Sequence, residues 1–370
     1  MKRVLLVGGG TGGHIMPLIA VAEEMQKAGG VRLDYMGPRS QFLSDFETHG
    51  IKCHTVPGSK MRRYFSLANI FMPFELLAGF IAALFKLYFI MPDAVFSKGG
   101  PGALAVLFAA RFYFIPIVVH ESDSIPGITN RISGSFAKKV VIALAPAAEY
   151  FKKKRVVLIG NPVRSELLEN IPAPESAKAA LGFDAKRPLV FFVGGSQGAA
   201  RINQFVVENL PEFLARFQVV HQSGNANFKD ADVMSRSVLN GLPDDKRGDY
   251  KLFGFMAADE IKNAYAAADI VVSRTGASSI AEIAVFGKPA ILVPIPASVA
   301  GEHQVLNASE YARTGAAAVI EETNLSPNIF LAEVQKILSD EGLRQKMSGA
   351  ARGFAKPNAA ADIAKVVLAV

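Results

Sequence analysis

The sequence predicts an α/β protein made of two doubly wound, Rossmann-like domains with a ligand cleft between them. Short β-branched runs alternate with helical segments, which is typical of a parallel sheet covered by helices on both faces. The alternation occurs twice, and each half opens on a strand that runs into glycines, "VLLVGGGTGGH" and "LVFFVGGSQGA". A length of 370 residues suits two domains of ordinary size.

The predicted strands follow one another in the same manner in both halves. In the first half they cover residues 3–7, 32–36, 93–97, 115–120 and 139–144, and in the second 189–193, 218–222, 270–273 and 290–293. A segment with three prolines, "IGNPVRSELLENIPAPES", separates the two series and predicts a linker near 160–174. We therefore expect domains at 1–160 and 161–345, followed by a C-terminal helical segment at 346–370.

Charge is unevenly distributed along the chain. Residues 1–160 carry 19 Lys and Arg against 10 Asp and Glu, whereas the remainder carries 21 against 23. A basic first half indicates an anionic partner, and from charge alone a phospholipid surface and a nucleic acid both fit. The single cysteine, Cys53, excludes an internal disulfide and suits a reducing cytoplasm, and the initial apolar run at 4–7 is too short for an export signal.

One apolar stretch, at residues 64–92, complicates this assignment. It contains only Glu75 and Lys86 as charged residues and is long enough to span a bilayer. A helix buried in the core is favoured, ahead of a helix that dips into a membrane face and, last, a true span. Lys60, Arg62 and Arg63 directly precede the stretch, and a basic rim beside apolar surface is typical of proteins that bind anionic lipid.

The glycine loops predict sites for phosphate. A glycine-rich turn between a strand and a helix points backbone N–H groups and a helix dipole at an anion. Gly8, Gly10 and Gly13 also match the dinucleotide pattern G-x-G-x-x-G, but Asp34 is poorly placed for a ribose and nothing else indicates a redox cofactor. Similar loops follow two other strands, "SKGGPGALAV" and "GGSQGA", which indicates a diphosphate ligand.

Further motifs indicate a nucleotide sugar. "RTGASSIAEIAVFGKP" places Glu282 on a helix after a strand-to-helix turn, where a carboxylate can accept both hydroxyls of a ribose. Gln304 in "GEHQVLNA" can bind sugar hydroxyls, while Arg164 in "GNPVR" and Ser196 in the second glycine loop can contact phosphate. Asp230-Ala231-Asp232 has the spelling of a metal-binding Asp-x-Asp motif, but its polar surroundings favour a solvated surface, so we expect neither metal nor cofactor.

Taken together, these motifs resemble the MurG family, the peripheral-membrane N-acetylglucosaminyl transferases of peptidoglycan synthesis. "GGTGGH..P", "HE....PG.TN", "GNPVR", "GGSQGA", "HQSG", "SRTGASSIAEI" and "EHQ..NA" occur in the family's order and spacing over nearly the whole chain. The resemblance implies a GT-B fold, a last helix that crosses back to the first domain, and attachment to the cytoplasmic face of the plasma membrane. It implies inverting transfer of GlcNAc from UDP-GlcNAc to the 4-hydroxyl of MurNAc in undecaprenyl-diphosphoryl-MurNAc-pentapeptide, with anionic phospholipid but no nucleic acid as a partner.

The resemblance also implies a set of site residues. The UDP-GlcNAc site would comprise Thr11, Gly12, Gly13, Asp123, Arg164, Ser196, Met256, Ala277, Ser278, Ser279, Ile280, Ala281, Glu282 and Gln304. The acceptor would contact Gly99, Gly100, Gly102 and Glu121, and the membrane would contact Lys60, Arg62, Arg63, Phe80 and Leu84. The chain departs from the family where Asp123 replaces an amide and where Pro101 replaces a tyrosine, which affects sugar and acceptor binding respectively.

His14 is the predicted catalytic base. It follows the first glycine loop directly, and the pKa of about 6.5 of an ordinary histidine suits removal of a hydroxyl proton near neutral pH. A histidine that only caps its own helix is the structural alternative. Three other functions remain open: a glycolipid synthase of the same fold such as a diacylglycerol glycosyltransferase, a nicotinamide-dependent dehydrogenase, and a nucleotide-binding module without catalysis.

Overall fold

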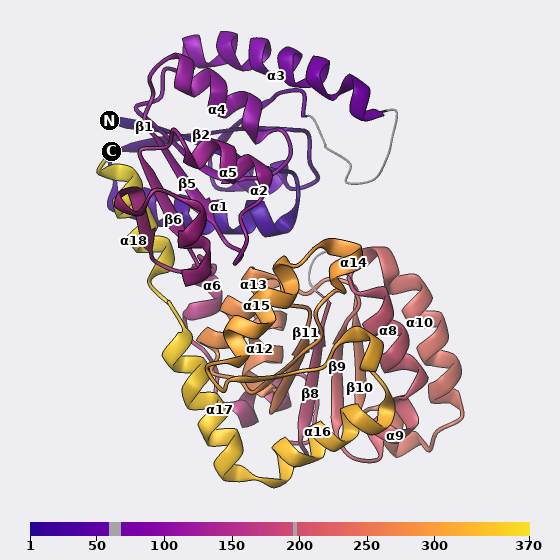
Figure 1. Cartoon of the computed structure of the whole chain (residues 1–370). Helices are drawn as coiled ribbons and strands as arrows, with labels where there is room; N and C mark the ends of the chain where they lie inside the picture. The colour runs from indigo at the N-terminus through magenta and orange to yellow at the C-terminus, as the bar shows by residue number, and fades with distance from the viewer. Residues whose placement is uncertain (59–67, 195–197) are drawn as a thin grey trace. The chain divides into compact units, whose positions relative to one another are not determined.

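The computed structural model describes residues 1–58, 68–194 and 198–370. The chain divides into two compact units, one formed by Met1–Ser165 with Lys356–Val370 and the other by Glu166–Ala355 (Figure 1). Each unit contains one sheet whose strand pairs are parallel and helices on both faces of that sheet. The predicted fold class, two doubly wound α/β domains, is therefore confirmed.

The described part of the first unit holds a seven-stranded sheet in the order β3-β2-β1-β4-β5-β6-β7. Its strands are β1 (Lys2–Gly8), β2 (Val31–Gly37), β3 (Lys52–Thr55), β4 (Ala94–Gly99), β5 (Ile117–Glu121), β6 (Lys139–Ile142) and β7 (Val156–Leu158). Strands β4 and β5 are buried over their whole length, and β1 from Val4 on, because helices cover both sides of the sheet.

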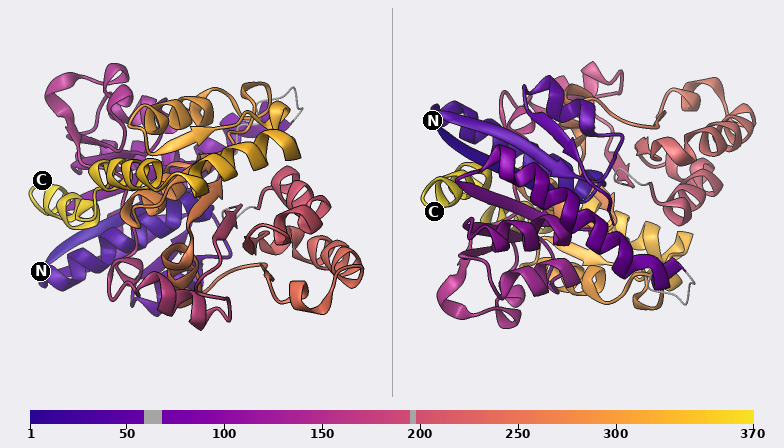
Figure 2. Two further views of the ribbon diagram at one scale, coloured as in Figure 1. Left: turned by 90° about the horizontal axis from the view of Figure 1, so that it is seen from below. Right: turned by 90° about the horizontal axis from the view of Figure 1, so that it is seen from above.

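Two helix layers cover the first sheet. On one face α1 (Gly12–Ala28) packs beside the C-terminal α18 (Ala359–Leu368), yellow in Figure 2, around a core that includes Ile19 and Ile363. On the other face α3 (Ala68–Ile90) and α4 (Ala103–Phe112) pack together. The remaining helical elements of this unit are α2 (Leu43–Thr48), α5 (Ile128–Gly134), η1 (Ala145–Tyr150) and η2 (Lys153–Arg155), while α6 (Ser165–Leu168) belongs to the second unit from Glu166 on.

The described part of the second unit holds a six-stranded sheet in the order β10-β9-β8-β11-β12-β13. Its strands are β8 (Leu189–Val193), β9 (Gln218–Gln222), β10 (Tyr250–Phe253), β11 (Ile270–Ser273), β12 (Ala290–Leu292) and β13 (Ala317–Val319). Phe192 packs with Phe213 and Phe330 on one face, while Phe191 packs edge-on against Tyr265 on the other, with ring centroids 5.2 Å apart. Alternating side chains of one strand thus fill two separate cores.

The helices of the second unit follow the same plan. They are α7 (Pro174–Ala180), α8 (Ala200–Glu208), α9 (Leu210–Leu214), α10 (Asn225–Asn240), α11 (Asp244–Arg247), α12 (Ala258–Ala267), α13 (Ala277–Val285), α14 (Ala297–Ala300), α15 (His303–Ala312), η3 (Glu322–Asn324), α16 (Pro327–Ser339) and α17 (Glu341–Phe354). Helices α8, α9 and α16 contribute to the core that contains Phe192 and Phe330.

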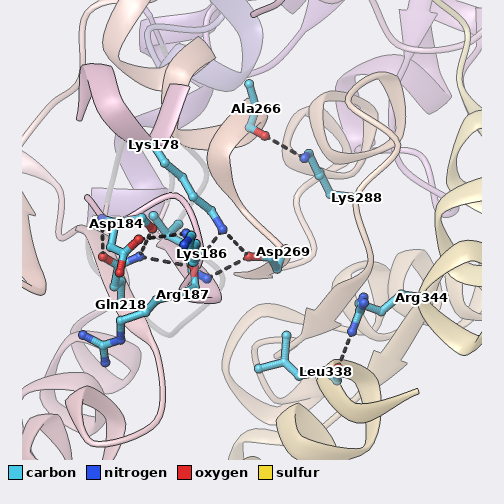
Figure 3. Close-up of polar contacts among 11 residues, drawn as sticks. Lys178, Asp184, Lys186, Arg187, Gln218, Ala266, Asp269, Lys288, Leu338 and Arg344 are labelled. Carbon is cyan, nitrogen blue, oxygen red and sulfur yellow. Dashed lines mark hydrogen bonds and ion pairs between the residues drawn. The ribbon is translucent and has the colours of Figure 1, made fainter. Parts of the chain in front are cut away.

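A polar network closes the amino end of the second sheet (Figure 3). Lys178 Nζ donates to Asp269 Oδ2 at 3.0 Å and to the carbonyl of Arg187 at 2.8 Å. Asp269 also accepts from the backbone N–H of Leu189, and Gln218 bonds the Asp184 backbone. These side chains form hydrogen bonds with backbone groups at the amino ends of the strands, opposite the ends that carry the glycine loops. Their role is therefore structural.

Two expectations about organisation differ from the structure. The C-terminal segment that returns to the first unit begins at Lys356 and not at 346, because α17 stays on the second unit, where Ser348 donates to the carbonyl of Gly287 and Arg352 packs against the same glycine. The expectation of a buried helix at 64–92 is wrong for its described part: only 17% of Met72–Ile90 is buried, and this helix is long and apolar enough to cross a membrane by length and composition.

Candidate active site

Each sheet has one point where the strand order reverses, and the predicted site residues gather at the carboxyl ends there. In the first unit the reversal lies between β1 and β4, where Gly8 pairs with Gly99 and Gly9 N–H donates to the Gly99 carbonyl at 2.8 Å. In the second it lies between β8 and β11, where Ser273 Oγ donates to the Val193 carbonyl at 3.2 Å. In open α/β sheets such reversal points are where ligands bind.

His14 lies in the first turn of α1, above the reversal point of the first sheet. Its Nδ1 is 2.7 Å from Thr11 Oγ1, and its Nε2 lies beside Gly100, where a Cβ atom would come within 2.9 Å of it. Gly100 has a φ of +88°, a conformation that favours glycine. The two glycine loops therefore meet at the imidazole because neither carries a side chain there.

Glu121 is held rigidly at the end of β5. Its carboxylate accepts from the backbone N–H groups of Asp123 at 2.9 Å and Gly127 at 3.1 Å, and from Asn130 Nδ2 at 2.9 Å. The Oδ1 of Asn130 lies 2.2 Å from where a Cβ of Gly99 would be, so this position also requires glycine. Glu121 is 4% exposed, and its bonds position the loop that carries Asp123.

Lys98, which the sequence interpretation did not select, lies at the centre of a buried polar cluster. Its Nζ donates to His120 Nδ1 at 2.8 Å, to Asn161 Oδ1 at 3.0 Å and to Ser122 Oγ. The other ring nitrogen, His120 Nε2, donates to the Gly160 carbonyl at 2.9 Å, which fixes His120 as the neutral tautomer protonated at Nε2. A lysine at the end of an otherwise apolar strand was the available sequence signal.

Burial and charge set the protonation states of these groups. The pKa of His14 is lowered to about 4, first by burial and then by the positive charge of Lys98, while Asp123 opposes the shift. Burial also lowers the pKa of Lys98 and raises the pKa of Glu121. At neutral pH His14 is therefore an uncharged imidazole that can accept a proton.

The other residues predicted on the first unit lie at the carboxyl end of its sheet or near it. Thr11 precedes α1, and Gly12 and Gly13 form its first turn. Gly102 caps α4 with a φ of +83°. Arg164 is half-buried. Burial raises the pKa of the Asp45 carboxyl on α2, and the positive charges of His49 and Arg164 oppose this rise.

A second cluster forms on the second unit around the start of α13. Thr275 Oγ1 donates to the backbone carbonyl of Gln304 at 2.7 Å, and Gln304 Oε1 accepts from the N–H of Ile295 at 3.3 Å. Asn307 Nδ2 donates to the Thr275 carbonyl at 3.1 Å. These bonds connect the loops after β11 and β12 with α15, and they orient the Gln304 amide.

Glu282 projects from α13 and is oriented by a buried tyrosine. The hydroxyl of Tyr265 donates to Glu282 Oε2 at 3.0 Å, and Tyr265 itself is fixed between Phe191 and Phe286. A carboxylate offers about four acceptor positions, so Glu282 can accept from ligand hydroxyls in addition to Tyr265. The sequence interpretation selected Glu282 but missed the tyrosine, which reads as an ordinary core residue.

The remaining residues predicted on the second unit have different exposures. Met256 and Ile280 are each 1% exposed, whereas Ser278, Ser279 and Ala281 are half-buried and Ala277 lies at the helix start. Ser196 lies outside the described residues, as do Lys60, Arg62 and Arg63. Gly198, which follows the last of the undescribed residues 195–197, has a φ of +72°.

The exposed apolar side chains of α3 are not the two that were predicted to contact the membrane. Phe80 and Leu84 are half-buried and pack against the core of the first unit. The outward face instead carries Phe74, Leu77, Ile81, Phe85, Tyr88 and Phe89. We call these six residues the α3 outer face.

Among residues 1–58, 68–194 and 198–370, no three His, Cys, Asp or Glu side chains lie close enough together to hold a metal ion.

Comparison with known proteins gives a consistent result. Residues 4–142 match the glycosyltransferase family 28 N-terminal domain and residues 189–367 match its C-terminal domain. Proteins named UDP-N-acetylglucosamine–N-acetylmuramyl-(pentapeptide) pyrophosphoryl-undecaprenol N-acetylglucosamine transferase are similar: one from Clostridium tetani is 34% identical over 89% of this chain and 88% of its own length, and one from Lachnospira eligens is 35% identical over 92% of each.

Solved structures show the same fold at lower identity. The chain is similar to MurG from Acinetobacter baumannii, with a TM-score of 0.75 and 24% identity over the full length of both chains. It is also similar to a UDP-GlcNAc 2-epimerase from Neisseria meningitidis bound to UDP-GlcNAc, with a TM-score of 0.69 and 16% identity over both full lengths.

Proposed function

This chain belongs to glycosyltransferase family 28, and on that premise we propose that it transfers GlcNAc from UDP-GlcNAc to the 4-hydroxyl of MurNAc in undecaprenyl-diphosphoryl-MurNAc-pentapeptide. The main support is that relatives at 34–35% identity, matched over about nine tenths of both chains, carry the name of this transferase. The geometry of the two clusters supports it independently.

We assign the donor to the cluster on the second unit. Glu282, oriented by Tyr265, accepts the ribose hydroxyls, and the Gln304 amide binds hydroxyls of the sugar. The start of α13 presents backbone N–H groups whose partial positive charge favours the diphosphate. A charge that develops on departing UDP is stabilised in the same way, by dipoles that are already oriented.

We assign the acceptor to the cluster on the first unit, with His14 as the base. If Nδ1–H donates to Thr11 Oγ1, the lone pair of Nε2 is directed towards the Gly100 side. The 4-hydroxyl oxygen of MurNAc attacks C1 of GlcNAc, the bond from C1 to the phosphate oxygen breaks, and the hydroxyl proton moves to Nε2. UDP leaves with the bonding electron pair, so the configuration at C1 inverts.

We further propose that the protein binds the cytoplasmic face of the plasma membrane as a peripheral protein. The α3 outer face offers exposed aromatic and aliphatic side chains, and Phe112 and Phe114 near the end of α4 are exposed as well. The charge excess of residues 1–160 favours anionic phospholipid over neutral lipid. A lipid-linked acceptor would then meet the enzyme at the membrane surface.

A two-stage experiment tests the activity. Isothermal titration with UDP, UDP-GlcNAc, UDP-glucose and NAD should show binding of the uridine nucleotides, with UDP-GlcNAc preferred to UDP-glucose, and no binding of NAD. Radiolabelled UDP-GlcNAc should then label a lipid-linked MurNAc-pentapeptide but not diacylglycerol. Labelling of diacylglycerol alone would identify a glycolipid synthase and contradict the proposal.

A further inference from the structure

The Lys98 cluster has an arrangement that the proposed reaction does not by itself require. Lys98 is 3% exposed, so its ammonium group cannot contact a substrate. All three donors of that ammonium are directed at named acceptors, on His120, Ser122 and Asn161. A buried cation with complete hydrogen bonding acts through its neighbours.

Lys98 and these neighbours come from three separate segments at the carboxyl end of the first sheet. Lys98 is on β4 directly before Gly99, His120 and Ser122 flank the end of β5, and Asn161 follows β7. Ser122 Oγ additionally donates to Asn161 Oδ1 at 3.0 Å. The lysine therefore joins the glycine loop at residues 99–102, the loop that contains Asp123 and the segment that leads to Arg164.

Lys98 is also close in the chain to the glycine that contacts His14, because Gly100, two residues after it, lies beside His14 Nε2. The charged and titratable groups around the pair are Asp123 and Glu121, which follow or end β5, and His120, which is neutral by its hydrogen bonds. Among these charged groups, Lys98 disfavours protonation of the His14 imidazole, whereas Asp123 favours it. Burial of the imidazole acts in the same direction as Lys98.

We propose that Lys98 is a positioning residue with two effects. Its hydrogen bonds hold the loops after β4, β5 and β7 together at the carboxyl end of the first sheet, where the acceptor is assigned. Its positive charge near His14 keeps the imidazole an uncharged base. Only the kinetic consequence rests on the proposed function, because hydrogen bonding and the state of the imidazole exist without substrate.

Two uncharged variants distinguish the effect of the charge of Lys98 from the effect of its hydrogen bonds between the loops. Lys98→Met removes the charge and all three donors, whereas Lys98→Gln removes the charge but retains an amide donor for Asn161 or His120. Lys288→Met is the matched control: Lys288 is a lysine of the second unit whose pKa burial likewise lowers, to about 8, and whose Nζ donates to the Ala266 carbonyl at 2.8 Å (Figure 3).

The first measurement is an NMR titration of ¹³C-labelled histidine in the full chain, which contains six histidines. The His14 signal is identified by its loss in His14→Asn, and His303 on the other unit serves as the internal reference. The midpoint of His14 should rise by about 0.5 to 1 pH unit in both Lys98 variants, as expected for loss of a nearby like charge, and remain unchanged in Lys288→Met. A His14 midpoint equal to that of wild type in both folded Lys98 variants would overturn the role of the charge.

The second measurement is steady-state transfer with the lipid-linked acceptor. Lys98→Met should raise the acceptor KM about tenfold while the UDP-GlcNAc KM stays constant. Lys98→Gln should raise the acceptor KM much less, because its amide retains part of the hydrogen bonding between the loops. An acceptor KM that is the same in wild type and both variants would overturn the positioning role. Should the chain transfer no sugar at all, the proposed function fails, and the histidine titration still decides the inference about charge.

Discussion

His14 Nε2 lies so close to the backbone of Gly100 that a methyl group on this glycine would stand 2.9 Å from the imidazole nitrogen. The same methyl group would come within 2.9 Å of the Cα of Gly9. The contact joins the ends of β1 and β4, the two neighbouring strands at which the order of the first sheet reverses. It explains why glycine stands at position 100: a side chain there would displace the proposed base.

Gly100→Ala should therefore impair catalysis more than stability. The positive φ of Gly100 costs alanine roughly 1–2 kcal/mol, and the displaced imidazole should lower kcat at least about tenfold with little change in UDP-GlcNAc affinity. Gly127→Ala is the control, because a Cβ there has no atom within 4 Å among the described residues and the φ of −61° is ordinary. Equal kcat for the two variants would argue against the contact.

The decline of kcat/KM at low pH should reflect protonation of His14. Its pKa of about 4 means that the imidazole is neutral, and able to accept a proton, from well below pH 6 upwards. The kcat/KM should thus stay level as the pH falls from 7 to about 5.5 and decline only below that, whereas an unperturbed histidine with a pKa of about 6.5 would cause a decline already near neutrality. His14→Ala should lower kcat by about 10²-fold or more without weakening UDP-GlcNAc binding.

Glu282 should control donor affinity. Loss of hydrogen bonds to a charged acceptor costs about 1.5–3 kcal/mol, so Glu282→Ala should weaken UDP-GlcNAc binding by roughly 10- to 100-fold in isothermal titration. Tyr265→Phe should give a smaller loss, because the carboxylate remains but its orientation by the 3.0 Å bond is lost. Glu333→Gln, on the surface of α16 and paired with Lys336, should bind like wild type. A Glu282→Ala variant with unchanged affinity would place the ribose elsewhere.

The α3 outer face should mediate membrane binding. Phe85 and Phe89 are 68% and 80% exposed, so Phe85→Ser with Phe89→Ser leaves the core intact and removes apolar surface that lipid would bury. Co-sedimentation with anionic vesicles should fall roughly tenfold for each phenylalanine. Ile329→Ser, which removes an exposed isoleucine of the second unit, should sediment like wild type. Undiminished binding of the double variant would show that another surface contacts lipid.

Helix α18 should be integral to the stability of the first unit. Ile363 is fully buried in the core formed with α1, so Ile363→Ala should lower the free energy of unfolding by about 2–5 kcal/mol in urea. Lys365→Ala, an exposed change on the same helix, should stay within about 0.5 kcal/mol of wild type. Similar unfolding midpoints for both variants would mean that α18 is not part of this cooperative core.

The strands show which part of the fold the sequence could predict. The nine predicted strands all occur, and β8, β9 and β11 have the expected bounds. The four that were missed, β3, β7, β10 and β13, are the four edge strands of the two sheets. An edge strand has one neighbour and is partly solvated, so sequences such as "KCHT" and "YKLF" lack the continuous apolar run that identifies an interior strand.

The site divides in the same way. The glycine loops, His14 and Glu282 could be selected from the sequence, because a loop without side chains and a polar residue just after a buried strand are local signals. Lys98, Asn130, Asn161 and Tyr265 could not, since their roles depend on partners distant in the chain.

By itself, then, the sequence determined the order of the interior strands, the family, and the residues whose chemistry is expressed in short motifs. The tertiary structure alone decided which strands meet at each sheet reversal, that the segment returning to the first unit begins at Lys356, and that α3 turns aromatic side chains outward. The physical reason is that hydrophobic period and turn chemistry are properties of neighbouring residues, whereas burial, hydrogen-bond partners and the pKa of His14 depend on segments that only folding brings together.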